Sequence, residues 1–257
     1  MAAKQYDIDM VNGSLAPKII RFALPLMAAS IIQLFFNAAD VMVVGKFVGD
    51  TSQAAVTSTA SLVTLLINLF LGLSMGSGVT VARATGAGDE QEVKDTVHTA
   101  ILLALIGGAF LTVVGIVVSP TLLAWMDTPG RALELASLYL RVYFAGAIPM
   151  LVYNFGAAVL RSVGDTRRPL YVLIVAGIIN VLLNMLLVIV FELSVVGVGV
   201  ATLISNVVSA GMILFFLMRE DDMIRLNLRR LGFVRAHLTR IVRIGAPAGV
   251  QGMVFSV

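Results

Sequence analysis

The stretch Lys18-Ile19-Ile20-Arg21-Phe22-Ala23-Leu24-Pro25 returns near the end of the chain as Arg240-Ile241-Val242-Arg243-Ile244-Gly245-Ala246-Pro247. Basic, aliphatic and small residues and the proline occupy the same places in both copies. Each copy follows a polar basic stretch and opens a long apolar segment. Paired segments of this kind are how an internal duplication shows itself in transporters. The sequence therefore predicts about half of a duplicated membrane protein, followed by the first turns of its second half.

The composition of the chain is that of a membrane protein. Hydrophobic residues make up 59% of its 257 residues and charged residues 13%, against about 45–50% and about 25% in soluble domains. The mean hydropathy is +0.98. So large an apolar surface cannot be hidden in one water-soluble core, so the bilayer must be its solvent. Cysteine is absent, which excludes disulfides and thiol catalysis, and two isolated histidines, His98 and His237, argue against a histidine metal cluster.

Apolar runs of about 20 residues, bounded by charged or turn residues, predict six complete transmembrane helices. They lie at 19–48, 54–81, 97–125, 133–160, 169–191 and 195–218, and a seventh begins at Ile241. The predicted fold is an all-α integral membrane protein with a six-helix transmembrane lobe at 19–218. An amino-terminal segment at 1–18 precedes the lobe, and this segment shows no removable signal peptide. A basic linker at 219–240 and the truncated start of a second lobe at 241–257 follow it.

The distribution of positive charge predicts the orientation of the chain in the membrane. All but three of the 18 Lys and Arg residues fall on the amino-terminal side of the predicted spans. The positive-inside rule therefore places the amino terminus in the cytoplasm. The basic run 219–243 contains one aromatic residue and lies beside helix ends, so it favours an orienting linker near anionic lipid over a nucleic-acid patch. Six spans separate the two repeat copies, which makes the repeats parallel, with two lobes facing each other across a cleft.

The first predicted span carries a polar stripe that ends in a carboxylate. Ser30, Gln33, Asn37 and Asp40 are spaced three, four and three residues apart, so all four share one helical face. A charged Asp at the centre of a membrane helix costs ~2.5–3.5 kcal/mol on insertion scales. Asp40 must therefore face a wet cavity, find a partner or be protonated, unless it is a span-end carboxylate that reaches the water outside.

Two later spans carry polar residues that could partner this carboxylate. Asn180 and Asn184 lie one turn apart on one face of the fifth span, and Thr202 belongs to a polar stripe in the sixth. An amide can donate to a carboxylate while its oxygen coordinates a cation. The same residues could instead stabilise helix packing through hydrogen bonds between helices.

Other residues predict packing, bends and caps. Gly72 and Gly76, four residues apart, are typical of close helix packing. Pro149 removes a backbone hydrogen bond inside the fourth span and allows a kink there. Asp89 with Glu92 three residues later resembles a capping box that opens the third helix.

Four stretches in order resemble the multidrug and toxic compound extrusion family. They are Asn-Ala-Ala-Asp-Val-Met-Val-Val-Gly at 37–45, Gly-Ala-Gly-Asp at 86–89, Arg-Ser-Val-Gly-Asp-Thr-Arg-Arg-Pro at 161–169 and Gly-Val-Gly-Val-Ala-Thr at 197–202. They are similar to the amino-terminal lobe of the family, and the resemblance covers essentially the whole chain. It implies half of a twelve-helix antiporter that exchanges cytoplasmic organic cations for inward-moving sodium ions or protons across the plasma membrane.

The resemblance also implies roles for single residues. Asp40 matches the first-helix carboxylate proposed to couple the cation, Asn180 the fifth-helix Asn and Thr202 a sixth-helix site residue. Gln33 and Asn154 match substrate-cavity positions, and Asn37 shares the face of Gln33. Prokaryotic members with a well-defined lobe site carry an Asp where this chain has Asn184. With Asp40 as the sole acidic group, a proton is as open as a sodium ion for coupling, and no other cofactor is implied.

Two further functions stay open at this point. A lipid-linked precursor flippase of the same superfamily would need several cations lining its cavity, and only Arg21, Lys46 and Arg141 fall within the spans, all towards span ends. A non-transporting membrane fragment is the other alternative. No serine-histidine-acid set, metal cluster or phosphate loop points to an enzyme. The expected partners are organic cations, the lipid bilayer and the second lobe.

Overall fold

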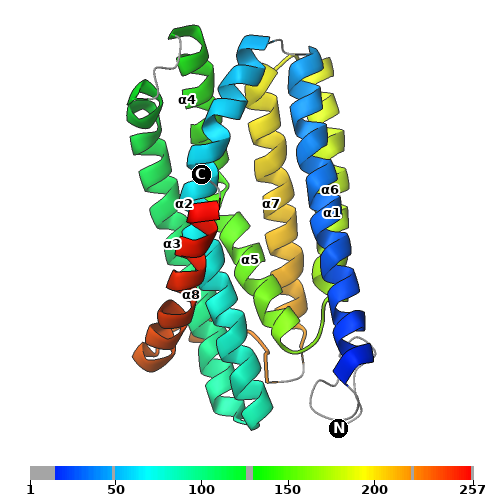
Figure 1. Ribbon diagram of the computed structural model, residues 1–257, viewed down its shortest axis with the longest axis vertical. Helices are drawn as coiled ribbons and strands as arrows, with labels where there is room; N and C mark the ends of the chain where they lie inside the picture. Colours follow the sequence, from blue (N-terminus) through cyan, green and yellow to red (C-terminus); the bar gives the residue numbers. More distant parts are fainter. Residues whose placement is uncertain (1–14, 48–49, 126–129, 221–222, 256–257) are drawn as a thin grey trace.

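The computed structural model describes residues 15–47, 50–125, 130–220 and 223–255 (Figure 1). Most of the amino-terminal segment predicted at 1–18 lies outside these ranges, as do parts of the linker and of the last segment. The described residues form helices without strands: α1 (Leu15–Phe47), α2 (Asp50–Ala87), α3 (Glu90–Trp125), α4 (Gly130–Ala145), α5 (Ala147–Ser162), α6 (Arg167–Asn184), a π-helical turn η1 (Met185–Val190), α7 (Ser194–Met218), a 3-10 turn η2 (Leu228–Arg230) and α8 (Arg235–Phe255).

Each predicted span coincides with a long helical rod. The rods are α1, α2, α3, the pair α4 and α5, α6 continued by η1, and α7. Within the described residues, four helices are long and apolar enough to cross a membrane, and α4 with α5 is a fifth if the bent pair is one span. The helix α2 lies at the place of the remaining predicted span. The prediction of an all-α membrane protein is confirmed.

The predicted basic connections meet at one end of the bundle. Figure 1 shows the start of α1, the corner between α2 and α3, the turn between α5 and α6 and the chain after α7 all at the lower end. The helix α8 begins at Arg235, so the last residues of the linker predicted at 219–240 are helical. The arrangement agrees with one positively charged face, while its cytoplasmic orientation stays a prediction.

The fourth rod is broken near the proline in its sequence. The helices α4 and α5 meet at Gly146 with a bend of 48°. Pro149 has no N–H to donate to the carbonyl three to four residues before it, so the backbone is free to turn there. The Thr112 hydroxyl of α3 donates to the Phe144 carbonyl at 2.8 Å, which satisfies an acceptor beside the break. The predicted kink is therefore an interruption one turn ahead of the proline.

The predicted capping box at the start of α3 is half formed. The Asp89 Oδ1 accepts a hydrogen bond from the backbone N–H of Glu92 at 2.9 Å, as predicted. The Glu92 carboxylate forms an ion pair with Arg240 of α8 rather than returning to the Asp89 backbone. An oppositely charged neighbour from a distant helix has displaced the local partner, so this part of the prediction was wrong.

The helix α8 is seated on α2 along a seam of glycines. A Cβ atom added at Gly72 would lie 2.2 Å from the Gly249 backbone nitrogen, and one at Gly76 would lie 2.4 Å from the Ile241 carbonyl oxygen. The Asn68 amide donates to the Gly252 carbonyl at 3.0 Å at one end of the seam. Such backbone contact is possible only without side chains. The predicted packing role of Gly72 and Gly76 is confirmed.

We expect Gly72→Ala to destabilise the protein by about 1–3 kcal/mol, because the new methyl group must push two backbones apart. Thermal unfolding of the purified protein in detergent measures the effect. Gly211→Ala is the matched control, since a Cβ at Gly211 meets no atom within 4 Å. That control should be neutral or gain about 0.5–1 kcal/mol of helix stability. A Gly72→Ala protein as stable as the control would contradict the close packing of the α2 backbone against the α8 backbone.

The turn between α5 and α6 is tied to the end of α7 by buried charges. Gly164 adopts a φ of +92°, which lets the chain reverse after α5. The Asp165 Oδ1 then accepts hydrogen bonds from the backbone N–H groups of Arg167 and Arg168, both at 3.1 Å. The Arg168 guanidinium lies 2.9 Å from the second Asp165 oxygen and also pairs with Glu220. Burial raises the pKa of Asp165 above its ordinary value, although these bonds oppose the shift.

Candidate functional site

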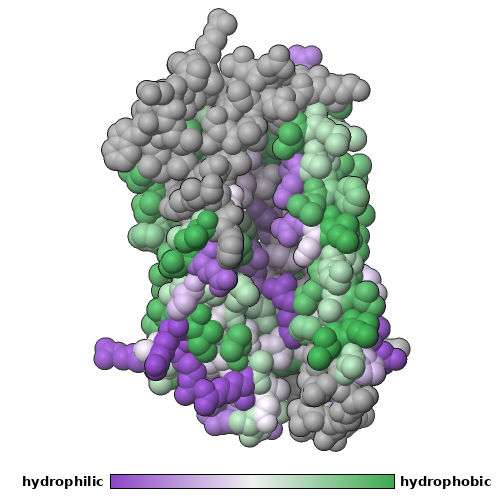
Figure 2. Space-filling model, in the orientation of Figure 1, coloured by the Kyte–Doolittle hydropathy of each residue, from purple (hydrophilic) through white to green (hydrophobic). Residues whose placement is uncertain are grey.

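A cavity of about 500 Å³ opens between α1, α2, α4, α5 and α7. Figure 2 shows hydrophilic atoms gathered in a groove down the middle of one face of the molecule, with apolar surface on both sides. The volume falls within the range of about 300–1,000 Å³ that is typical of small-molecule sites. The cavity is therefore large enough for a drug-sized ligand.

The polar stripe of α1 forms one wall of this cavity. Gln33, Asn37 and Asp40 line it from α1, while Asn154 faces it from α5 and Thr202 from α7. The Asn154 amide donates to the Met150 carbonyl of its own helix at 2.8 Å. Asp40 thus faces the cavity, and the alternative of a carboxylate directed only at outside water is not what the fold shows.

Behind the cavity wall, a chain of hydrogen bonds joins α1, α6 and α7. The Asn184 amide donates to Asp40 Oδ1 and, at 3.2 Å, to Asn180 Oδ1. The Asn180 amide donates in turn to the Thr202 hydroxyl at 3.4 Å. The Thr202 hydroxyl donates to the Val198 carbonyl at 2.9 Å. Asp40 is therefore held by a polar network that reaches across three helices.

Asn184 occupies the centre of this network and is fully buried. Its Oδ1 is a buried acceptor with no hydrogen-bond partner among the described residues. It is also the last residue of α6, and the wide π-helical turn η1 follows it directly. Turns of this type interrupt α-helices mostly at functional sites. An unpartnered oxygen beside a carboxylate is a natural position for a cation.

The structure brings all seven residues singled out in the sequence into one region. Asp40, Thr202, Gln33, Asn37 and Asn154 line the cavity, and Asn180 and Asn184 lie behind it. The predicted pairing of amides with the Asp40 carboxylate is present. The division of these residues into cation-coupling and substrate-binding groups stays a prediction.

Nine of the described lining residues were not singled out from the sequence. Among them, Tyr139 and Tyr143 of α4 line the cavity with ring centroids 6.0 Å apart, and Met150 and Asn206 line it from α5 and α7. Asn206 belongs to the polar stripe of the sixth span. The tyrosines lie four residues apart, one helical turn, and their hydroxyls within an apolar span were the available signal.

Residues 25–186 match the family model MatE. The chain belongs to the MatE family. The MatE chain is 28% identical over 242 residues to the probable multidrug resistance protein YoeA of Bacillus subtilis, covering 91% of this chain and 52% of that protein. It is 27% identical over 248 residues to the probable multidrug resistance protein NorM of Thermotoga maritima, covering 93% and 52%.

Solved structures agree with the sequence relatives. The outward-facing structure of a multidrug resistance MATE family transporter of the MOP superfamily matches this MatE chain with a TM-score of 0.86 at 30% identity. The match covers 92% of this chain and 52% of that structure. The chain thus spans about half the length of the curated relatives it matches. These relatives are transporters, not enzymes, and the fold predicted as half of a duplicated transporter is confirmed.

Proposed function

We propose that the intact protein is a cation-coupled antiporter that exports organic cations across the plasma membrane. In this proposal the Asp40 carboxylate is the group for which the substrate and the coupling ion compete. The observation that carries it is a cavity of about 500 Å³ in which Asp40 is the one carboxylate among the described lining residues. Neutralisation of Asp40 by a proton or a sodium ion would favour one conformation and release the organic cation.

The cavity wall suits an organic cation. Tyr139 and Tyr143 supply aromatic rings to the cavity that Asp40 also lines, and the face of an aromatic ring attracts cations through its quadrupole. The described lining includes no Lys, Arg or His. A lipid-linked pyrophosphate would meet a carboxylate here instead of the cations that it requires, which disfavours the flippase alternative.

The coupling ion would bind next to Asn184. The unpartnered Asn184 Oδ1 and the Asp40 carboxylate are oxygen ligands of the kind that hard cations prefer. A proton could instead bind Asp40 directly, leaving the hydrogen bond from the Asn184 amide in place. Both ions remain within the proposal, and transport under imposed gradients separates them.

Transport into inverted membrane vesicles containing the intact protein tests this proposal. A fluorescent organic cation should accumulate when a sodium or a proton gradient is imposed separately, and it should leave when that gradient is collapsed. Accumulation driven by neither ion would rule out cation-coupled export.

Because the amino terminus is expected in the cytoplasm, cysteine labelling at position 4 should occur only from the cytoplasmic side in an otherwise cysteine-free chain.

Asn184→Asp should make transport more dependent on sodium. The substitution places a second carboxylate in contact with Asp40, and two adjacent like charges need a cation or a shared proton between them. We expect at least about a tenfold gain in apparent sodium affinity, which corresponds to about 1.4 kcal/mol. Vesicle uptake measured across a sodium series reads this out. Ala236→Asp, at an exposed position in the first turn of α8 outside the cavity, adds the same negative charge and is the matched control.

A further inference from the structure

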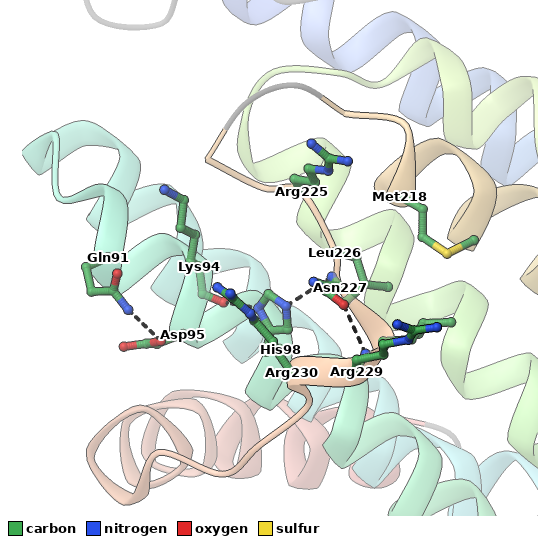
Figure 3. Close-up of a pocket in the computed structure, with 11 residues that line it drawn as sticks. Gln91, Lys94, Asp95, His98, Met218, Arg225, Leu226, Asn227, Arg229 and Arg230 are labelled. Carbon is green, nitrogen blue, oxygen red and sulfur yellow. Dashed lines mark hydrogen bonds between the residues drawn. The ribbon is translucent and has the colours of Figure 1, made fainter.

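A second pocket lies at the end of the molecule that carries the basic connections. It has a volume of about 810 Å³ and is formed by the first turns of α3 and the chain between α7 and α8. Figure 3 shows Gln91, Lys94, Asp95 and His98 on α3, opposite the segment 225–230. None of its lining residues lines the cavity that contains Asp40. The proposed transport function does not use this pocket.

The wall contributed by the linker is fixed to α3. The Asn227 backbone N–H donates to His98 Nε2 at 3.1 Å, and the His98 Nδ1 lies 2.6 Å from the Lys94 carbonyl oxygen (Figure 3). Further along, the Thr99 hydroxyl bonds both the Gly232 carbonyl and the Val234 N–H, each at 3.3 Å. The linker is therefore fixed to α3 by hydrogen bonds. Positive charges that only orient the chain in the membrane would not need such an attachment.

Buried side chains hold the same segment from the inside. Ile224 and Leu226 are 4% and 3% exposed, and the Leu226 N–H donates to the Leu217 carbonyl at 3.0 Å. The Asn227 Oδ1 accepts a hydrogen bond from the Arg229 N–H at 3.0 Å, which starts the turn η2. These contacts fix the backbone at Leu226 and Asn227, and so they also fix where the neighbouring Arg225 and Leu228 line the pocket.

The pocket is strongly positive. Lys94, which also pairs with Glu90 at 3.4 Å, lines it from α3, and Arg225, Arg229 and Arg230 line it from the linker (Figure 3). Asp95 is the one carboxylate in the lining, and it accepts a hydrogen bond from Gln91 at 3.0 Å. Within the described part of the chain, no acidic side chain pairs with the three arginines. Among the described residues, these exposed guanidinium groups therefore have no acidic partner.

We propose that this pocket binds a phosphate group, supplied by the headgroup of an anionic phospholipid or by a free phosphorylated solute. Guanidinium groups bind phosphate through paired N–H donors, and three arginines line this pocket. The pocket lies at the ends of the apolar helices α3 and α7, where lipid headgroups would meet the protein. Met218 and Leu228 give it an apolar edge against which a glycerol backbone can rest.

Binding to the purified intact protein in an uncharged detergent tests the proposal. Native mass spectrometry and calorimetry would follow dioctanoyl phosphatidylglycerol, dioctanoyl phosphatidylcholine and inorganic phosphate. The pocket variant carries Arg225→Gln, Arg229→Gln and Arg230→Gln together. A matched control carries Arg83→Gln, Arg235→Gln and Arg243→Gln, which removes the same charge from exposed arginines outside the pocket.

Wild type and the control should bind phosphatidylglycerol, and the pocket variant should bind it about tenfold more weakly or worse, because charge-assisted hydrogen bonds are lost. Lys94→Gln, on a different element, should also weaken binding, and it replaces the triple variant if that variant does not fold. Binding of inorganic phosphate as well would identify a free phosphate as a sufficient ligand. Binding of phosphatidylglycerol alone would identify the lipid headgroup.

Three outcomes would overturn the proposal. Wild type binding neither phosphatidylglycerol nor phosphate would exclude a phosphate site. Equal affinity for phosphatidylcholine would show that the charge of the ligand is not recognised. An equal loss in the pocket variant and the matched control would assign the effect to net charge alone. Each outcome is independent of whether the cavity at Asp40 transports organic cations.

Discussion

Asp40→Asn is expected to abolish coupled efflux by the intact protein while the protein remains folded in the membrane. The replacement has nearly the same shape, and its Oδ1 can still accept the hydrogen bond from the Asn184 amide. It removes the one carboxylate from the described cavity lining. Without that charge, neither a proton nor a sodium ion can be exchanged for the organic cation.

Drug resistance of cells that express the variant measures this effect, together with the amount of protein in the membrane. Glu134→Gln is the control, because Glu134 is an exposed carboxylate of α4 that does not line the cavity. Cells with the control should stay as resistant as wild type, and cells with Asp40→Asn should fall to the level of cells without the protein. Full resistance in the Asp40→Asn cells would remove Asp40 from the mechanism.

Arg168→Met should destabilise the protein by about 3–5 kcal/mol, the usual result of removing one partner from a buried ion pair. The substitution leaves the carboxylates of Asp165 and Glu220 without their shared guanidinium, and these residues are only 1% and 6% exposed. The turn between α5 and α6 would then lose its attachment to the end of α7. Thermal unfolding in detergent should show a large downward shift.

Arg167→Met serves as the control for this effect. Arg167 is exposed, and only its backbone N–H bonds Asp165, so its replacement should change stability by less than about 0.5 kcal/mol. Adding Asp165→Asn and Glu220→Gln to Arg168→Met should restore part of the loss, because no buried charge then remains unpaired. If Arg168→Met unfolds like Arg167→Met, the buried charges do not hold the turn in place.

Most of the fold could be predicted because the membrane imposes a simple rule. Apolar runs must be helices, and charged stretches must lie between them. The face shared by Gln33, Asn37 and Asp40 was equally predictable, since spacings of three and four residues place side chains together on any helix. The amides of Asn180 and Asn184 pointed to this face because polar groups in hydrocarbon need partners.

The remaining features depend on contacts between distant parts of the chain. Glu92 pairs with Arg240 instead of with the backbone of Asp89, and sequence spacing cannot show a partner 148 residues away. Tyr139 and Tyr143 look the same in the sequence whether they face lipid, core or cavity. The attachment of the linker to His98 was invisible for the same reason. Helical periodicity places a residue on a face, but packing decides what that face meets.

Equilibrium binding of a fluorescent organic cation to the purified intact protein tests whether the cation and the coupling ion compete for Asp40. Wild type should bind the cation, and a rising concentration of protons or sodium ions should displace it competitively. Asp40→Asn should lose both the binding and the displacement. If Asp40→Asn binds the organic cation with unchanged affinity and the same ion still displaces it, the competition does not occur at Asp40.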